Sequence, residues 1–219
     1  ALPPEALLSR LDRALTLLTV GPRDRPERLR TMRAAIAWSH DLLTLAEQIL
    51  FRRLAVFVDG CDLDAVEAIS ADGDHTSRQF TDVLDVVATL VEASLLRSES
   101  GPDGSVRYRM LETIREFAAE QLAGSGETGT IRRRHASYYL ALAERYTLAQ
   151  LHPEADQVVT LLESEHANLR AALMWFSETG DHQSLLRLAA ALGRFWTGQG
   201  YYQEGRTWLE RGLEDQGGP

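Results

Sequence analysis

Apolar residues recur at helical spacing along most of the chain, which predicts a mainly α-helical protein. The first such pattern is a leucine series that predicts a helix over 4–19, ended by Gly21 and Pro22. Polar residues then lead to helices predicted over 29–43, 44–58, 63–70 and 81–93. Thr44 and Glu47 have the spacing of a capping box, and Asp62 is placed to cap the helix that follows it.

After residue 93 the hydrophobic period changes from helical to two. Residues 94–100 and 105–110 read as two short strands, and the Gly-Pro-Asp-Gly turn between them predicts a β-hairpin. The pattern returns to helix over 111–123. Three or four helices, a hairpin and a further helix form a winged-helix module, which we place over residues 29–125.

The remainder of the chain, 130–219, predicts antiparallel helical hairpins with short connections. Helices are expected over 130–149, 153–178, 181–198 and 201–215. The last pair follows the tetratricopeptide spacing of about 34 residues. The residues that carry this pattern are Leu192, Gly193, Trp196, Tyr202, Gly205, Leu209 and Gly212.

In this repeat the small residues 193, 205 and 212 are expected to let two helices approach, and the large residues 196, 202 and 209 to fill the seam. A second interpretation is a peptide-binding groove lined by Trp196, Tyr201, Tyr202 and Trp208.

Composition is that of a soluble globular protein: 219 residues, 44% hydrophobic and 25% charged. No apolar run is long enough for a membrane span, and no signal peptide is visible. Cys61 is the sole cysteine, so the chain forms no internal disulfide and no cysteine-based zinc site. We expect Cys61 to be a buried small apolar residue in a cytoplasmic protein.

All 23 basic residues are arginine, and this excludes a standard phosphate-binding Walker A loop, which needs lysine. The glycine-rich stretch 124–130 is therefore read as a linker. Ser39, His40 and Asp41 are consecutive on a predicted helix and cannot form a catalytic triad. His166, beside Glu163 and Glu165, is read as helix-surface polarity, and no metal site or enzyme activity is predicted.

The net charge of −9 is concentrated in residues 61–129, which carry 5 Arg and 14 acidic residues. The helix over 81–93 is the one that would read DNA in a winged helix, yet it contains Asp82, Asp85 and Glu92 and no arginine. Because DNA binding needs positive charge, we do not expect DNA to bind through this surface. The arginine clusters 23–33 and 131–135 have two interpretations, ion pairs to the acidic region or contact with phosphate.

Several segments in order resemble bacterial signal-transduction ATPases with numerous domains, in particular AfsR/LuxR-type transcriptional regulators. They are "LRTMRAAIAWSHDLLTLAEQILFRRLAVFVDGCDLDAVEAI", "LVEASLLRSE", "RYRMLETIREFAAEQL", "RRRHASYYLALAE" and "LESEHANLRAALMW". The resemblance implies a piece of a longer protein, as the missing initiator Met also suggests. It would hold the end of an ATPase-associated helical domain (1–28), a winged helix and the first repeats.

In related ATPases of apoptosis and plant immunity, a Met-His-Asp stretch where the wing enters the final helix touches bound ADP. Met110, Leu111 and Glu112 fall on that stretch. Leu111 replaces the histidine and cannot donate a hydrogen bond to phosphate. Glu112 is either an ordinary helix-start carboxylate or a switch contact, and Arg107 or Arg109 are further candidates for reaching phosphate.

The resemblance thus implies a regulatory segment with no cofactor of its own and ATP or ADP in an absent upstream domain. The winged helix would hold that nucleotide-binding domain in its resting state, and the repeats would receive a protein or small-molecule inducer. The alternative is a DNA-binding winged-helix factor with a helical dimerisation or peptide-binding tail.

Overall fold

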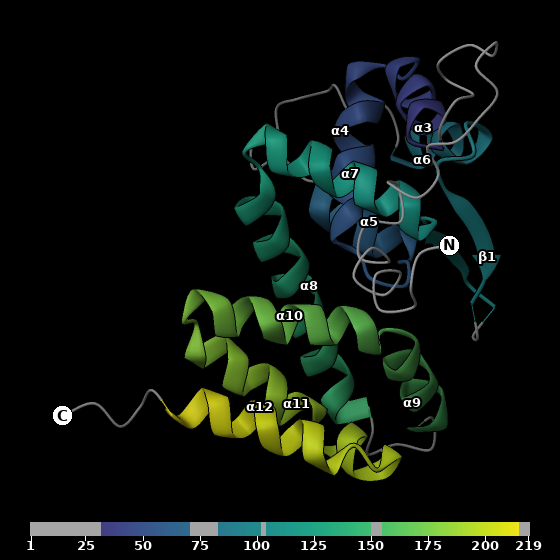
Figure 1. Ribbon diagram of the computed structural model, residues 1–219. Helices are drawn as coiled ribbons and strands as arrows, with labels where there is room; N and C mark the ends of the chain where they lie inside the picture. The colour runs from purple at the N-terminus through teal and green to yellow at the C-terminus, as the bar shows by residue number, and fades with distance from the viewer. Residues whose placement is uncertain (1–31, 71–82, 102–103, 150–154, 215–219) are drawn as a thin grey trace, which may run out of the picture. The chain divides into compact units, whose positions relative to one another are not determined.

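The computed structural model describes residues 32–70, 83–101, 104–149 and 155–214, and within these ranges the chain is mostly helical with one two-stranded sheet (Figure 1). This confirms the predicted fold class. The chain forms two compact units. Unit 1 contains the described residues of 32–55, 70–98 and 108–127, and unit 2 contains those of 56–69, 99–107 and 128–214. The predicted helix 4–19 and most of the arginine cluster 23–33 lie outside the described residues.

Unit 1 is a small helical assembly centred on one helix. The helix α4 (Leu45–Arg53) packs against α6 (Val83–Glu92) and α7 (Glu112–Ser125), and α7 also packs against α3 (Met32–Asp41). Their apolar faces supply a core of fully or nearly fully buried side chains: Ile36, Leu50, Phe51, Val87, Leu90, Phe117 and Leu122. Burial of these apolar surfaces is the main force that holds the four helices together.

The start of α4 confirms the predicted capping box. The Thr44 hydroxyl accepts from the Glu47 N–H at 3.4 Å, and the Glu47 carboxylate accepts from the Thr44 N–H at 2.6 Å. The α-helix ends at Arg53, earlier than predicted, because the chain tightens into the 3₁₀ helix η2 (Leu54–Val56). Asp62 caps α5 (Leu63–Ser70) as expected, accepting from the Ala65 N–H at 2.8 Å.

The predicted hairpin is present as β1 (Arg97–Ser100) and β2 (Val106–Arg109). The Gly101 N–H donates to the Ser105 carbonyl at 2.7 Å, and this register places Arg97 opposite Arg109. Gly104 has φ +83°, a left-handed conformation that glycine adopts without strain. The helix expected after the hairpin is α7.

The glycine-rich stretch 124–130 is not the linker predicted. The helix α7 runs to Ser125 and α8 (Thr128–Ala149) begins three residues later, so most of the stretch is helical. Gly126 ends α7 in the left-handed conformation, with φ 77°. Glu127 then accepts from Arg52 Nε at 2.9 Å and from Arg53 Nη2 at 2.7 Å, which fixes this short connection to the end of α4.

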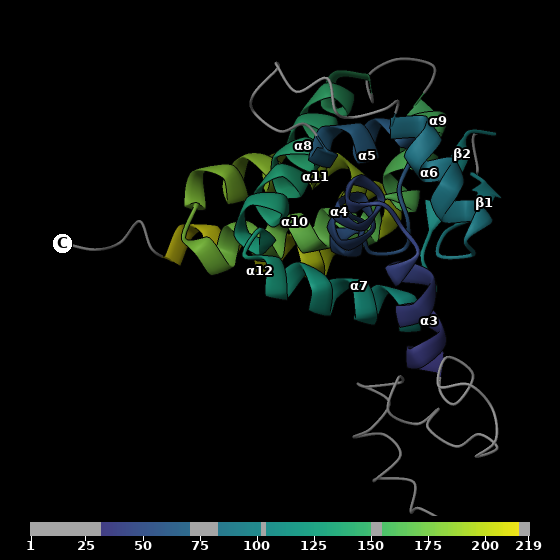
Figure 2. The same ribbon diagram turned by 90° about the horizontal axis from the view of Figure 1, so that it is seen from above.

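Unit 2 is built around α8, which packs against α10 (His166–Thr179) and α11 (His182–Gln199) (Figure 1 and Figure 2). The last helix, α12 (Tyr202–Glu214), packs along α11. The single helix predicted over 153–178 is wrong, because α9 (Ala155–Ser164) is separated from α10 by one non-helical residue. The break falls at Glu165, which has φ −98° and ψ 2° and a buried side chain.

Two glycines of α12 allow its close approach to α11. A Cβ added at Gly205 would lie 2.6 Å from the Trp196 ring, and one at Gly212 would lie 2.5 Å from Leu186 Cδ2. This confirms the role predicted for both glycines. Leu192 and Trp196 are buried, as expected, and the Trp196 ring faces Gly205 of α12.

The face of α12 predicted to pack against α11 is wrong, because the helix is rotated by part of a turn from the predicted orientation. Tyr202 is 62% exposed and Leu209 is 39% exposed, so neither fills the seam, whereas Trp208 is 7% exposed. The inward face is set by Gly205, Trp208 and Gly212, which lie three and four residues apart. A Cβ at Gly193 would meet nothing within 4 Å, so the close approach does not require glycine there.

Candidate functional site

Four of the predicted switch residues lie consecutively where β2 gives way to α7. Arg109 and Leu111 are exposed and Met110 is half-buried. Leu111 occupies the position before the first turn of α7 and makes no side-chain cap. Glu112 is in that first turn and accepts from Arg115 Nη2 at 2.7 Å, and this hydrogen bond lowers the pKa of Glu112 despite partial burial.

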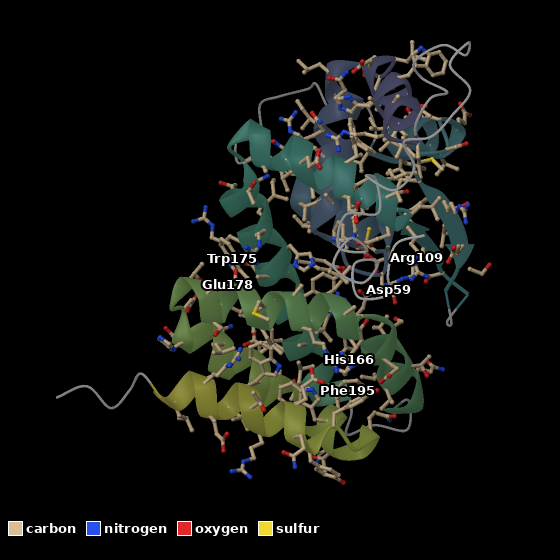
Figure 3. The ribbon with its side chains drawn as sticks, in the orientation of Figure 1. Asp59, Arg109, His166, Trp175, Glu178 and Phe195 are labelled. Carbon is tan, nitrogen blue, oxygen red and sulfur yellow. The ribbon has the colours of Figure 1, made fainter. Side chains whose placement is uncertain are left out.

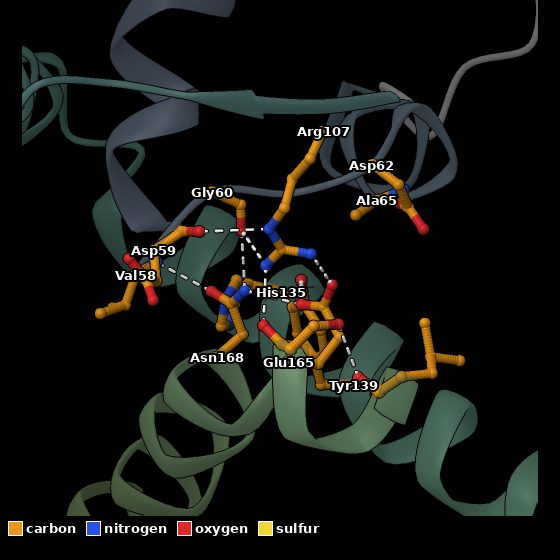
Figure 4. Close-up of polar contacts among 12 residues, drawn as sticks. Val58, Asp59, Gly60, Asp62, Ala65, Arg107, His135, Tyr139, Glu165 and Asn168 are labelled. Carbon is orange, nitrogen blue, oxygen red and sulfur yellow. Dashed lines mark hydrogen bonds and ion pairs between the residues drawn. The ribbon is translucent and has the colours of Figure 1, made fainter. Parts of the chain in front are cut away.

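Arg107, the fifth predicted residue, is engaged in a buried polar cluster of unit 2 (Figure 4). We define the polar cluster as the side chains of Arg107, His135, Tyr139, Glu165 and Asn168 with the backbone of residues 58–60. Arg107 Nε donates to the Asp59 carbonyl at 3.2 Å, and Nη2 donates to the carbonyls of Gly60 and Ser164, each at 3.0 Å. Its Nη1 forms an ion pair with Glu165.

The backbone turn at Asp59 and Gly60 supplies two of these acceptors. Asp59 has φ 71° and Gly60 has φ 88°, so two consecutive residues are left-handed. This conformation is natural for glycine and is tolerated by Asp better than by most residues. The turn presents both carbonyls to one guanidinium group, whose fork of N–H donors suits several acceptors at once.

Glu165 and Asn168 hold the other side of the polar cluster. The second Glu165 oxygen accepts from the Tyr139 hydroxyl at 2.9 Å and from Asn168 Nδ2 at 2.8 Å. Asn168 Nδ2 also donates to the Gly60 carbonyl at 2.9 Å, and its Oδ1 accepts from the Val58 N–H at 2.8 Å. Because every capacity of this amide is used, its orientation is fixed by the network.

Burial sets the ionisation of the polar cluster. Desolvation lowers the pKa of His135 to about 4, so near neutral pH the ring is uncharged and its Nε2 lies 3.3 Å from Asn168 Oδ1. Burial raises the pKa of Tyr139 and of the Cys61 thiol, and the charge of Glu165 adds to both effects. Burial is the largest single effect on the pKa of Arg107 and acts to lower it, but the hydrogen bond to Glu165 and the charge of Glu165, with smaller electrostatic contributions from its neighbours, together raise it.

Glu165 and His166 correct the reading of this stretch as surface polarity, because they are only 3% and 8% exposed. The rings of His166 and Phe195 pack edge to face, with centroids 5.3 Å apart (Figure 3), and His166 Nε2 lies 3.1 Å from Glu204 Oε1. Arg170 Nε donates to the same oxygen at 2.8 Å. This second group ties α10 to α12, while Glu163 remains exposed.

The outward face of α6 has no basic side chain. Leu84, Asp85, Ala88 and Glu92 are exposed, and Val86, Val87 and Leu90 are buried on the other side. Asp82, which was predicted to belong to this face, lies outside the described residues. The described face is therefore acidic and apolar, with nothing to neutralise a phosphate.

In the described ranges, no three His, Cys, Asp or Glu side chains gather as a metal site, and no helix combines the length and apolar character that crossing a membrane requires.

Comparison with known proteins identifies the helices and hairpin around α6. Residues 43–123 match the winged helix-turn-helix domain. The chain is also 43% identical over 220 residues to proteins of Mycobacterium tuberculosis and Mycobacterium bovis, each named "Putative HTH-type transcriptional regulator". The alignment covers 99% of this chain and 24% of each relative, so the chain spans about a quarter of their length.

An "Uncharacterized protein" of Mycobacterium tuberculosis is 33% identical over 144 residues, which is 63% of this chain and 34% of that protein. No solved structure matches the chain significantly. The winged helix-turn-helix match spans α4 to α7, so α6 and the β1–β2 hairpin are its third helix and its wing.

The sequence did not reveal most of the polar cluster. Tyr139 and Asn168 lie within predicted helices, and helical spacing does not indicate which distant groups their polar atoms will bind. The one local signal is the Asp59-Gly60 pair directly after the predicted helix 44–58, and this pair forms a turn that presents two carbonyls to Arg107.

Proposed function

We propose that the chain is the regulatory segment of a bacterial transcriptional regulator. In this proposal the winged helix holds an ATPase domain of the longer protein in its resting state. The helical hairpins α8–α12 receive an inducer or a partner protein, and the chain itself catalyses nothing. The proposal is supported by the 43% identity to proteins named as HTH-type regulators, of which the chain spans about a quarter.

The outward face of α6 carries this proposal. A winged helix that reads DNA uses its third helix against the major groove. Here the corresponding exposed side chains are Leu84, Asp85, Ala88 and Glu92. Two carboxylates and no cation on that face repel phosphate, so this copy of the module is better suited to contact a protein surface than DNA.

The helical hairpins support the receiving role. Trp196 and Trp208 are buried in the α11–α12 seam, so they stabilise the hairpin and are not free to bind. Tyr202 is 62% exposed and remains the aromatic candidate for a partner contact. A ligand shifts a two-state protein only if it binds the two states with different affinity, and in this proposal the two states differ in the packing of the helical hairpins.

The nucleotide would belong to the upstream domain, and Arg109 with the Met110–Glu112 stretch would face it. ADP retention in the longer protein tests this part of the proposal. Glu112→Ala and Arg109→Ala are expected to speed ADP release. If neither variant alters ADP retention or activation, these residues have no switch role.

A gel-shift titration of this chain with duplex DNA tests the reading of α6. We expect no salt-dependent shift for the native chain. The double variant Asp85→Arg, Glu92→Arg is the matched control, because it supplies two cations on the same helix. It is expected to gain binding that weakens with salt by roughly 0.9 log units per log unit of salt for each phosphate contacted.

A DNA-binding transcription factor is the second candidate function. It is favoured by the match to the winged helix-turn-helix domain and by Arg97 and Arg109, which lie opposite each other on the wing. Tight, salt-sensitive binding by the native chain that is lost in Arg97→Ala, Arg109→Ala would establish this candidate and exclude the first.

A further inference from the structure

Arg107 is held entirely by groups distant from it in sequence. It lies on β2, five residues before α7 begins. Its guanidinium contacts come from the turn at Asp59 and Gly60 and from Ser164 and Glu165, which lie 47 to 58 residues away. The side chain is only 14% exposed, so this is a fixed attachment of the strand and not a surface ion pair.

The far side of the attachment is the break between α9 and α10. Ser164 is the last residue of α9 and Glu165 is the single residue before α10. Arg107 binds both of them, the first through its carbonyl and the second through its carboxylate. Any change in the angle between α9 and α10 therefore moves two of the four groups that hold Arg107.

Glu165 is itself positioned from α8 and α10. Tyr139 on α8 donates its hydroxyl to Glu165 at 2.9 Å, and Asn168 on α10 donates at 2.8 Å. With 4% of its side chain exposed, Glu165 has little access to water as a substitute partner. Removing either partner of a buried ion pair leaves the other charge uncompensated. A change at Arg107 should therefore destabilise the surroundings of Glu165, and the reverse.

We propose that Arg107 and Glu165 form a latch that couples the α9–α10 break to the second strand of the wing. A movement of α9 against α10 withdraws Ser164 and Glu165 from Arg107 and frees β2, which continues through Met110 and Leu111 into α7. The latch deepens the proposed function, since it names the route by which helical hairpins that receive a signal would act on the wing. The mechanical link itself needs no inducer, nucleotide or DNA.

Hydrogen exchange of the full chain, read by mass spectrometry, tests the latch in both directions. Glu165→Gln is expected to speed exchange of the β2 amides roughly tenfold, because breaking one side of a buried ion pair is strongly destabilising to what it holds. Arg107→Met is expected to speed exchange around Ser164–Asn168 by a similar factor. Reciprocity is the decisive result, since coupling between two sites acts equally both ways.

Tyr139→Phe is the milder variant if the others fail to fold. It removes one hydrogen bond to Glu165 and touches neither Arg107 nor the wing. It is expected to speed exchange of the β2 amides by a smaller factor, roughly two- to fivefold, because a single hydrogen bond is lost.

Arg170→Gln is the matched control, because it breaks the ion pair between Arg170 on α10 and Glu204 on α12, and neither residue belongs to the polar cluster. It should leave β2 exchange unchanged. Faster exchange confined to the mutated side, an equal rise over the whole chain, or a β2 response to Arg170→Gln would each overturn the latch. Because these measurements involve no nucleotide and no DNA, the latch and the proposed function can fail separately.

Discussion

At the scale of single residues, the polar cluster concentrates charge and hydrogen bonding where water has little access. Arg107 and Glu165 are paired and Asn168 uses both its donors and its acceptor, so the buried groups are satisfied. Burial lowers the pKa of His135 to about 4, so its ring stays neutral well below the pH at which an ordinary histidine gains a proton. Protonation of His135 would place a charge beside a full set of partners, and folding opposes it.

Acid is therefore expected to weaken the folded state through His135. Its folded pKa of about 4 lies below the ordinary value of 6.5, so between those values the unfolded chain binds more protons. Stability should fall as pH drops, by about 2 kcal/mol from pH 6.5 to 4.5. Urea unfolding across that range should show this slope in the native chain and lose it in His135→Gln. An unchanged slope in the variant would contradict this assignment.

At the scale of elements, local chemistry in the sequence predicted the elements whose ends are set by their own residues. The Thr44–Glu47 capping box, the Asp62 cap and the Gly104 turn all use groups within a few positions, so spacing alone identified them. The break at Glu165 could not be found this way. Glu165 is held there by hydrogen bonds to Arg107 and Tyr139, which are 58 and 26 residues distant, so no local pattern identifies its position.

The same limit explains the error in the phase of α12. Tyr201, Tyr202, Trp208 and Leu209 offer two adjacent aromatic and apolar rows, and helical spacing fits either one. The row that faces α11 is decided by where the α12 backbone can approach the Trp196 ring. That position is Gly205, and only the structure shows that it is buried. The predicted switch residues show the same limit. Arg109–Glu112 lie at the expected junction between strand and helix, whereas Arg107 belongs to the polar cluster, which no sequence motif predicted.

Three glycines on the α11–α12 hairpin should respond differently to alanine. Gly205→Ala is expected to destabilise by about 1–3 kcal/mol, because the new methyl meets the buried Trp196 ring. Gly212→Ala should be milder, since the nearest atom is the end of the flexible Leu186 side chain. Gly193→Ala has open space and is expected to stabilise by roughly 0.5–1 kcal/mol. Equal effects of all three in chemical denaturation would show that the seam is not closely packed.

At the scale of the whole molecule, unit 2 is discontinuous in sequence. It includes segments of 56–69 and 99–107 together with 128–214. Phe57 lies against His135 and Tyr139, and Arg134 Nη1 donates to the Ile69 carbonyl at 3.2 Å. The helical region after residue 127 therefore completes its core with chain from the segment matched to the winged helix.

Cutting the chain at residue 128 should expose this dependence. Residues 128–219 alone would leave Glu165 and Asn168 without Arg107, Gly60 and Val58, and buried polar groups without partners are strongly destabilising. Circular dichroism should show a melting temperature lower than that of residues 56–219 by more than about 10 °C. Equal melting of the two pieces would mean that the helical hairpins are self-sufficient.

The left-handed backbone at Asp59 also limits which residues evolution can place at this position. A collection of diverged copies should show Gly, Asn and Asp at position 59, because these three tolerate φ 71° while larger side chains resist it. An acidic residue at a position that varies so little could be mistaken for a reactive carboxylate. The restriction would instead come from the backbone, because the left-handed conformation directs the residue 59 carbonyl at the Arg107 guanidinium group.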